Sequence, residues 1–507
     1  MASQEHHSEG HSYFHILKTM VMIGGSSLVN VLFSIVRNKT LAVLLGPAGI
    51  GQVGLYQSIV DLTQTLAGCG VASSGVRQIA EATGTGDNDR IARTATVLRR
   101  TSIVLGLLGA ITLAALAQPI ARLTFSDDQH VYGVALLSVA VVLQLAAGGQ
   151  VALIQGLRDI GGLARMQIIS GLASTTITIV LVYMFGPSAI APAIVAGAAA
   201  LLVTCWWFSR KVAISPPRMT FREIWQEVVP LMQLGFVFML AGLMGYGASY
   251  IVRLFVLWEE GIAAAGQYHA AWVLGGIYAG FILQAMGADF YPRLTAVAND
   301  HAAVNRLVNQ QTQVSLLLAA PGVLATLTFA SVAMWLFYTP EFYPAANILR
   351  WICLGMLLRI IAWPMGFIMV AKGRRVIFLV SDATAFLVHI GLAWLLVPRF
   401  GPIGSGIAFF GLYAWHCLFV YCIARKLSQF RWSPANLKLT ILFLMISGLV
   451  FCATVYLPPW QGMAVGTLAT ILSGLYSLHY LVGLMPPESL PSPIRTWVAK
   501  SAVSKSA

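Results

Sequence analysis

Residues 131–154 read VYGVALLSVAVVLQLAAGGQVALI and contain no charged side chain. A helix needs about 20 apolar residues to cross the hydrocarbon core of a bilayer, because each residue advances it by about 1.5 Å. The stretch therefore predicts a membrane-spanning helix. Similar windows along the chain predict fourteen spans in all, at residues 16–44, 51–75, 101–118, 131–154, 167–185, 189–208, 230–257, 265–287, 314–336, 346–371, 376–397, 403–423, 439–457 and 463–484.

The composition of the whole chain agrees with this prediction. Of the 507 residues, 58% are hydrophobic and 10% are charged, and the mean hydropathy is +0.78. A soluble domain carries about 25% charged residues, because its surface faces water. The composition therefore excludes a soluble enzyme, a nucleic-acid-binding protein and a disordered scaffold as descriptions of the whole chain. It predicts an all-α polytopic membrane protein.

The positions of the lysines and arginines predict the orientation of the chain in the membrane. Twenty-four of the 31 fall in connections on one side of the predicted spans, whereas the opposite side holds only Arg122 and Arg399. Positive charge concentrates in the cytoplasmic loops of membrane proteins. We therefore expect both termini in the cytoplasm, and the net charge of +13 requires no nucleic acid as a partner.

Short motifs recur along the chain at a constant offset. Phe185-Gly186-Pro187 recurs 215 residues later as Phe400-Gly401-Pro402, and Gly51-Gln52 recurs as Gly266-Gln267 at the same offset. The repeating unit would hold six spans, an even number, so both copies would have the same orientation. The pattern predicts two parallel-repeat six-helix lobes related by an axis along the membrane normal, an architecture that works by alternating access.

This repeat defines the predicted domains. Spans one to six form an N-lobe, spans seven to twelve form a C-lobe, and two extra spans follow. The predicted segments are a cytoplasmic tail (1–15), the N-lobe (16–208), a cytoplasmic linker (209–229), the C-lobe (230–423), a basic linker (424–438), the extra spans (439–484) and a second cytoplasmic tail (485–507).

Four cations within the predicted spans are the candidate substrate-binding residues: Arg37, Lys39, Arg253 and Arg359. A charged residue in a span is costly unless it faces protein or water, so such residues are the first candidates for a transport path. Structural alternatives stay open. Arg37 and Lys39 could serve helix packing, and Arg253 could extend to the outer interface. Arg359 could form an ion pair with Asp382.

Asp61 is the only acidic residue well inside a predicted span. It could carry a proton that couples transport to a gradient, or it could be the counter-ion of Arg37. Gln57 and Gln64 in the same span, and His389 in the eleventh, are secondary candidates for the site. A histidine that only packs and hydrogen-bonds is the alternative for His389.

The sign of the charge inside the spans indicates the class of cargo. Cations outnumber acids there, whereas a pump for cationic drugs would favour a buried carboxylate. The planar guanidinium of arginine donates two hydrogen bonds at once and suits phosphate. We therefore expect a phosphate-bearing anion as the cargo. The six cysteines lie in apolar stretches without CxxC spacing, and no GxxxxGK[ST] loop occurs, so we expect neither metal nor cofactor.

Several motifs give the chain a family resemblance. Asn38-Lys39-Thr40-Leu41-Ala42, followed by Leu45-Gly46-Pro47-Ala48-Gly49-Ile50-Gly51, resembles the first hairpin of Wzx-type O-antigen flippases in the MOP superfamily. Gly156-Leu157-Arg158-Asp159, Tyr291-Pro292-Arg293-Leu294 and Ala371-Lys372-Gly373 resemble motifs of that family after its fourth, eighth and tenth spans. The likeness covers about residues 12–425.

The resemblance implies a flippase of the bacterial cell inner membrane that serves lipopolysaccharide biosynthesis. Such a protein would translocate an undecaprenyl-diphosphate-linked oligosaccharide, the O-antigen repeat unit, from the cytoplasmic to the periplasmic leaflet through a cationic cavity. Its partners would be the lipid-linked oligosaccharide, membrane lipids and the polysaccharide polymerase machinery. Members of that family commonly have twelve spans. The extra pair at 439–484 departs from this pattern and resembles the helix count of lipid II flippases.

Other functions remain open at this stage. A flippase for lipid II, or for a capsule or exopolysaccharide unit, would have the same features. An exporter of a soluble anion or drug on the same fold would need no lateral opening for a lipid tail. A polymerase or ligase would need a sizeable outside loop for its catalytic groups, and the longest outside connection, at about 119–130, is too short. We therefore predict that the chain is not an enzyme.

Overall fold

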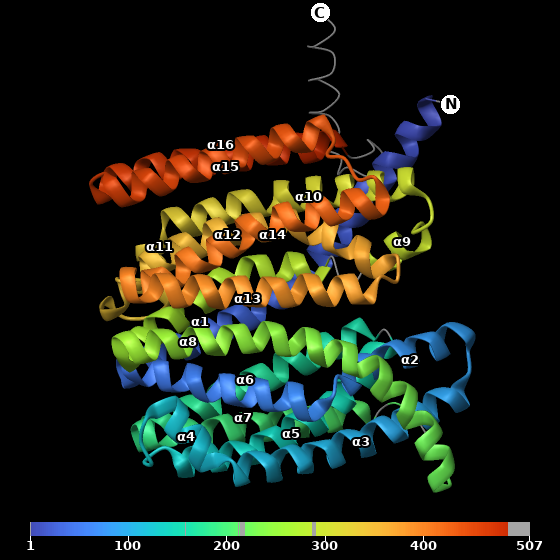
Figure 1. Ribbon diagram of the computed structural model, residues 1–507, viewed down its shortest axis with the longest axis vertical. Coiled ribbons are helices and arrows are strands. Elements are labelled where there is room, and N and C mark those ends of the chain that lie inside the picture. Colours follow the sequence, from blue (N-terminus) through green and yellow to red (C-terminus); the bar gives the residue numbers. More distant parts are fainter. Residues whose placement is uncertain (1, 158, 211, 213–218, 286–289, 485–507) are drawn as a thin grey trace, which may run out of the picture. The chain divides into compact units, whose positions relative to one another are not determined.

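The computed structural model describes residues 2–157, 159–210, 212, 219–285 and 290–484 (Figure 1). Every regular element in these ranges is a helix, as the sequence predicts. Arg158 of the family motif, the tail at 485–507 and the side chains of residues 1–28 lie outside the described part of the chain. The first helix, α1 (Ala2–Gly68), already begins within the predicted N-terminal tail.

Ten of the described helices are long and apolar enough to cross a membrane, or eleven if the bent pair α10 (His301–Thr328) and α11 (Ala330–Phe337) is one span. Three of the ten are unusually long: Val29–Gly68, Gly161–Ser209 and Arg222–Ile277 contain 40, 49 and 56 residues. Each of them overlaps two of the windows predicted from the sequence, and Gly161–Ser209 consists of two α-helices joined by a 3-10 turn at Gly186–Ala189. The number of fourteen spans and the side on which the termini lie remain predictions.

The chain folds into two compact units. The N-unit comprises Val29–His269 and Leu336–Phe342, and the C-unit comprises Met1–Leu28, Ala270–Trp335 and Tyr343–Ala507. The N-unit holds most of α1, then α2 (Val71–Thr85), α3 (Asn88–Ala115), α4 (Ala117–Phe125), α5 (Val131–Gly156), α6 (Ile160–Phe185), η1 (Gly186–Ala189), α7 (Ile190–Ser209), most of α8 (Phe221–Ala285) and η3 (Pro340–Phe342). The C-unit holds the end of α8, α9 (Tyr291–Ala296), α10, most of α11, α12 (Ala345–Ala371), α13 (Arg375–Phe400), α14 (Ile403–Ser428), α15 (Pro434–Tyr456) and α16 (Pro459–Leu484).

In the N-unit, α5 packs between α3 and α7 (Figure 1). Val134, Leu137 and Val141 are fully buried at helical spacing on α5. They pack with Tyr56 and Val60 of α1, which are also buried. The uncharged stretch at 131–154 therefore lies within a helix bundle, because its buried apolar side chains meet neighbouring helices.

In the C-unit, α12 is the central helix. It packs against α10 and α14, and 72% of its apolar window is buried. A helix that is apolar on all sides is expected at the centre of a bundle. This placement positions Arg359, the one charged residue in the middle of α12, within the protein.

The extra helices α15 and α16 both pack against α10. Asn309 of α10 fixes the linker that precedes them: its Oδ1 accepts a hydrogen bond from Ser433 N at 2.8 Å, and its Nδ2 donates one to Arg431 O at 3.0 Å. Asn305, one turn earlier, accepts a hydrogen bond from Arg431 N at 3.0 Å. Two asparagines one turn apart thus satisfy the main chain of a connection that has no helix of its own.

The predicted repeat recurs in the backbone. Gly46 bends α1 with φ 64° and ψ −170°, and Gly261 bends α8 with φ 84° and ψ 176°. Gly186 and Gly401, which end α6 and α13, have φ 61° and ψ −144° and −150°. A positive φ with extended ψ is accessible almost only to glycine. Both pairs are 215 residues apart, which is the offset of the sequence motifs.

The two bent helices also make a reciprocal contact inside the N-unit. A Cβ atom at Gly51 would meet the carbonyl oxygen of Ile262, and a Cβ atom at Gly266 would meet that of Pro47. The two contacts exchange under the repeat offset, as expected for equivalent surfaces around a two-fold axis. The glycines identified as a repeated motif are therefore where α1 and α8 approach most closely.

Candidate functional site

Two residues of the predicted site, Arg37 and Lys39, lie near the middle of α1, close to the segment at 336–342 of the N-unit. Lys39 Nζ donates a hydrogen bond to the carbonyl oxygen of Tyr338, and Asn38 Nδ2 lies 3.4 Å from the Tyr338 hydroxyl. Tyr338 is 1% exposed and packs on Phe342, with 4.9 Å between the ring centroids. Arg37 is half-buried and has no carboxylate within 4.0 Å among the described residues. One donor of Lys39 thus holds a backbone carbonyl, whereas the described residues offer Arg37 no carboxylate.

Arg253 lies deep in the N-unit and is only 4% exposed. Its Nη1 donates hydrogen bonds to Gly54 O at 2.7 Å and to Ser58 Oγ, and its Nη2 lies 3.3 Å from His269 Nδ1. Its Nε is buried without a partner. This position rules out the predicted alternative that Arg253 extends to the outer interface. Its guanidinium instead joins α8 to the second half of α1.

Asp61 is half-buried on α1, and its Oδ1 accepts a hydrogen bond from Gln57 Nε2 at 2.8 Å. No cation lies within 4.0 Å of it among the described residues, so the predicted pairing with Arg37 is not formed in this structure. Gln64, one turn later, donates a hydrogen bond to Gln144 Oε1 on α5. Gln57, Asp61 and Gln64 therefore form a polar stripe along one helix.

Arg359 lies in the C-unit, against aromatic rings. Its guanidinium carbon is 4.8 Å from the ring centroid of Trp363, one turn later on α12, and 5.7 Å from that of Tyr413 on α14. The predicted ion pair with Asp382 is absent from the described residues. Ring faces stabilise the guanidinium without neutralising it, so its hydrogen-bond donors stay available for an anion.

His389 is 4% exposed on α13, and its ring packs edge-on against Phe409 with 6.0 Å between centroids. Its Nε2 is buried without a hydrogen-bond partner. The ring thus packs as the alternative requires, but its Nε2 lacks the hydrogen bond which that alternative included, and the role of His389 stays a prediction.

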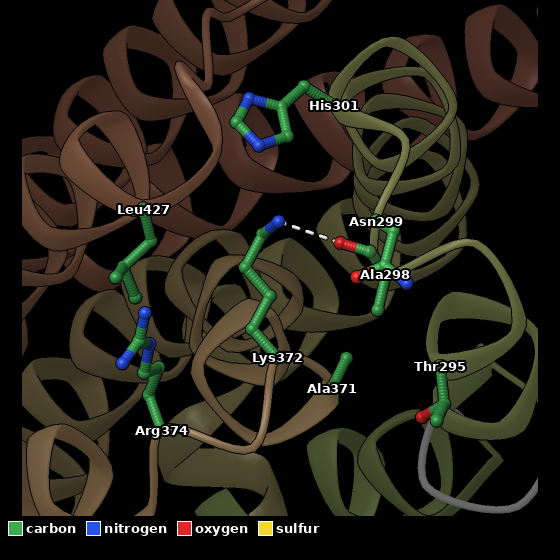
Figure 2. Close-up of a pocket in the computed structure, with 8 residues that line it drawn as sticks. All are labelled: Thr295, Ala298, Asn299, His301, Ala371, Lys372, Arg374 and Leu427. Atoms are coloured by element: carbon green, nitrogen blue, oxygen red, sulfur yellow. Dashed lines mark hydrogen bonds between the residues drawn. The ribbon is translucent and has the colours of Figure 1, made fainter.

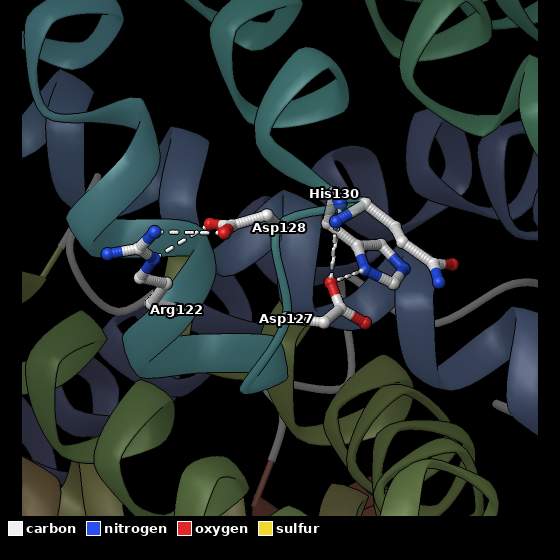
Figure 3. Close-up of polar contacts among 5 residues, drawn as sticks. Arg122, Asp127, Asp128 and His130 are labelled. Carbon is white, nitrogen blue, oxygen red and sulfur yellow. Dashed lines mark hydrogen bonds and ion pairs between the residues drawn. The ribbon is translucent and has the colours of Figure 1, made fainter.

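The ion pairs that the described residues do form lie outside the apolar parts of the helices. Figure 3 shows two of them at the end of α4, where Arg122 binds Asp128 at 2.7 and 2.9 Å and Asp127 binds His130 Nδ1 at 2.7 Å. Hydrogen bonding to Arg122 and the charge of Arg122 lower the pKa of Asp128. Partial burial acts to raise the pKa of Asp127, but hydrogen bonds from His130 outweigh it and lower the pKa.

The structure thus brings together some of the predicted site residues. Arg37, Lys39, Gln57, Asp61, Gln64 and Arg253 belong to the N-unit, and Arg359 and His389 belong to the C-unit. The sequence did not identify Tyr338, His269 or Tyr413 as partners of the cations. Trp363 could have been found, because a residue four positions after Arg359 shares its helix face.

This arrangement can bind an anion by hydrogen bonding. Arg37, Arg253 and Arg359 all lie in apolar helices, and the described residues offer none of them a carboxylate within 4.0 Å. A positive charge without a counter-ion is expensive in a membrane unless an anion or water reaches it. In the described part of the chain, no three His, Cys, Asp or Glu side chains gather into a metal-binding group.

Comparisons with known proteins agree with this geometry. Residues 40–347 match a protein family described as "Polysaccharide biosynthesis protein". The lipid III flippase of Escherichia coli (strain K12) is 23% identical over 413 residues, which cover 78% of this chain and 95% of that protein.

Solved structures have the same fold. A structure of the lipid II flippase MurJ in an inward closed conformation is 12% identical, with a TM-score of 0.66 over 90% of this chain and 98% of that one. An inward-facing multidrug resistance MATE family transporter of the MOP superfamily is 17% identical, with a TM-score of 0.62 over 79% of this chain and 95% of that one. The predicted MOP-type fold is thereby confirmed.

Proposed function

Because the chain belongs to the family of polysaccharide biosynthesis proteins, we propose that it flips a lipid-linked oligosaccharide carried on a polyprenyl diphosphate. The cargo would move from the cytoplasmic to the periplasmic leaflet of a bacterial inner membrane. The family is described by polysaccharide biosynthesis and the curated relative is named a lipid III flippase, which supports a lipid-linked cargo over a soluble anion or drug. The function is transport and not catalysis.

The observation that carries the proposal is that, among the described residues, no carboxylate lies within 4.0 Å of Arg37 or Arg359. A diphosphate brings the negative charge that the described acidic side chains do not bring to these guanidinium groups. One guanidinium group donates hydrogen bonds to two phosphate oxygens at once, which holds the diphosphate in one orientation. Lys39 and Arg253 are further candidate contacts, although both already donate hydrogen bonds to protein oxygens.

The transport cycle follows from the costs of moving each part of the cargo. The cations would replace water around the diphosphate in a cationic cavity. The glycan would cross through the hydrated part of that cavity. The polyprenyl chain would stay in lipid, because exposing it to water costs about 0.8 kcal/mol per CH₂ group. The parallel repeat favours alternating access. Asp61 is the proposed proton carrier that couples the cycle to a gradient.

The O-antigen repeat unit on undecaprenyl diphosphate is the cargo we propose first, because of the family motifs in the sequence. The flipped unit would then pass to a polysaccharide polymerase. Another lipid-linked glycan is the second candidate, and the names of the relatives favour it. Native mass spectrometry of gently extracted protein would distinguish these candidates by the mass of the retained lipid.

The test of transport uses proteoliposomes with a fluorescent polyprenyl-diphosphate oligosaccharide. Arg359→Ala and Arg37→Ala should each abolish flipping while the protein still inserts and purifies as the wild type does. Arg359→Lys should recover less activity than its charge suggests, because an ammonium lacks the plane that stacks on Trp363. Arg122→Ala is the matched control, since it removes an exposed cation outside the apolar helices. Full activity of both arginine-to-alanine variants would refute the proposed role of the cations.

A further inference from the structure

A cavity of about 460 Å³ opens in the C-unit, and none of the cations discussed above lines it (Figure 2). It lies where the segment between α9 and α10, the turn between α12 and α13, and the last turn of α14 meet. Lys372 and Arg374 supply its charge, and Asn299 and His301 supply further polar groups. None of the residues that line it is acidic. The cavity is therefore electropositive.

Lys372 is positioned at the centre of this cavity. It is half-buried, and its Nζ donates a hydrogen bond to Ala298 O at 2.7 Å. An ammonium group has three donors, so two remain for a ligand. Figure 2 shows the ammonium between the Ala298–Asn299 backbone and the His301 ring, with Arg374 on the other side of the turn. The contact with Ala298 O holds the lysine head at one place, which reduces the entropy lost when a ligand binds.

The ends of two helices border the cavity and differ in how they are capped. Helix α13 begins after Arg374 without a side-chain cap, so the positive end of its dipole remains available to an anion. Helix α10 begins after Asp300, whose carboxylate accepts hydrogen bonds from Ala302 N and Ala303 N at 2.9 and 3.1 Å. The carboxylate of Asp300, beside the lining residues Asn299 and His301, is thus bound to its own helix.

An apolar surface leads away from the charged rim along α13. Val376, Val380 and Leu387 are 74%, 51% and 65% exposed, and their spacing places them on one face of the helix. A phosphate at Arg374 with hydrocarbon along this face matches the two parts of a membrane lipid. A basic pocket at the cytoplasmic end of membrane helices is a recognised binding place for anionic headgroups.

We propose that this cavity binds the phosphate of an anionic membrane lipid, whose acyl chains lie along the exposed face of α13. The bound headgroup joins the α9–α10 segment to the α12–α13 turn at the membrane surface. This site is separate from the cargo-binding cations and does not depend on what the protein transports. Its test accordingly uses binding and not flipping.

The experiment titrates the purified full chain in detergent with phosphatidylglycerol and with zwitterionic phosphatidylcholine, and counts bound lipids by native mass spectrometry. Wild-type protein should retain phosphatidylglycerol in preference. The double variant Lys372→Met/Arg374→Gln should bind it about 30-fold more weakly, from the loss of two cations near the headgroup. Arg374→Gln alone should weaken binding about 5-fold, and it leaves the contact of Lys372 with Ala298 in place.

The matched control is Arg425→Gln/Lys426→Gln, which removes two exposed cations from the last turn of α14 outside the cavity. This control should bind phosphatidylglycerol as the wild type does. Equal binding by the pocket variants and the control would overturn the proposal. Inorganic pyrophosphate serves as the second probe: if it binds in a Lys372-dependent manner while phosphatidylglycerol does not, the ligand is a soluble phosphate and the lipid assignment is wrong.

Discussion

Replacing Gly266 by alanine is a direct test of how closely α1 and α8 cross. A Cβ atom there would overlap the carbonyl oxygen of Pro47 and approach the main-chain nitrogen of Gly51, so the two backbones would have to separate. Overpacking of this kind costs about 1–3 kcal/mol, with the upper end expected where the obstacle is backbone. Alanine recovers about 1 kcal/mol of helix propensity. We therefore expect a net destabilisation of about 2 kcal/mol.

The control for this experiment is Gly245→Ala on the same helix. Gly245 is exposed, and nothing lies within 4 Å of a Cβ atom at that position. Only the propensity gain applies, so this variant should be slightly more stable than the wild type. The same chemical change on one helix is thus expected to have opposite signs at two positions.

The measurement is the melting temperature in mild detergent, with unfolding monitored by intrinsic tryptophan fluorescence. Gly266→Ala should melt below the wild type and Gly245→Ala at or above it. The double variant Gly51→Ala/Gly266→Ala should lose less than the sum of the single variants, because either Cβ atom alone separates the helices. If Gly266→Ala melts no lower than Gly245→Ala, the inferred reciprocal contact is incorrect.

Three further predictions concern polar contacts. Asp61→Asn should leave folding intact but make flipping in proteoliposomes insensitive to an imposed proton gradient; unchanged gradient dependence would exclude Asp61 as the carrier. Asn309→Ala leaves Ser433 N without its acceptor, so we expect the free energy of unfolding to fall by about 1–3 kcal/mol. Protease should then cleave the linker before α15 faster than in the wild type, and cleavage at the wild-type rate would contradict this. Arg122→Ala should lower the melting temperature little at neutral pH, because its pair with Asp128 is exposed. Because that pair lowers the pKa of Asp128, any stabilisation it gives is present above about pH 4 and disappears as the pH falls through the lowered pKa. A difference in melting temperature between wild type and Arg122→Ala that grows in acid would contradict this assignment.

The sequence by itself determined that this protein is a helical membrane protein with an internal repeat. Hydropathy is a sum over neighbouring residues, so a stretch such as 131–154 predicts a membrane helix in any tertiary context. The internal repeat could also be recognised from short sequence motifs, because Gly186 and Gly401 adopt the same backbone conformation and only glycine adopts it readily. The sign of the intramembrane charge could be read from which charged residues fall within the predicted spans.

Only the tertiary structure decided what each cation contacts. Arg253 binds Gly54 and Ser58, almost 200 positions earlier in the chain, and no spacing rule relates them. Arg359 meets Tyr413 from another helix, and that contact depends on how α12 and α14 pack. Whether a buried arginine holds two helices together or keeps its donors for a ligand is set by the groups that packing brings within about 3 Å, and such short-range geometry is absent from the order of residues.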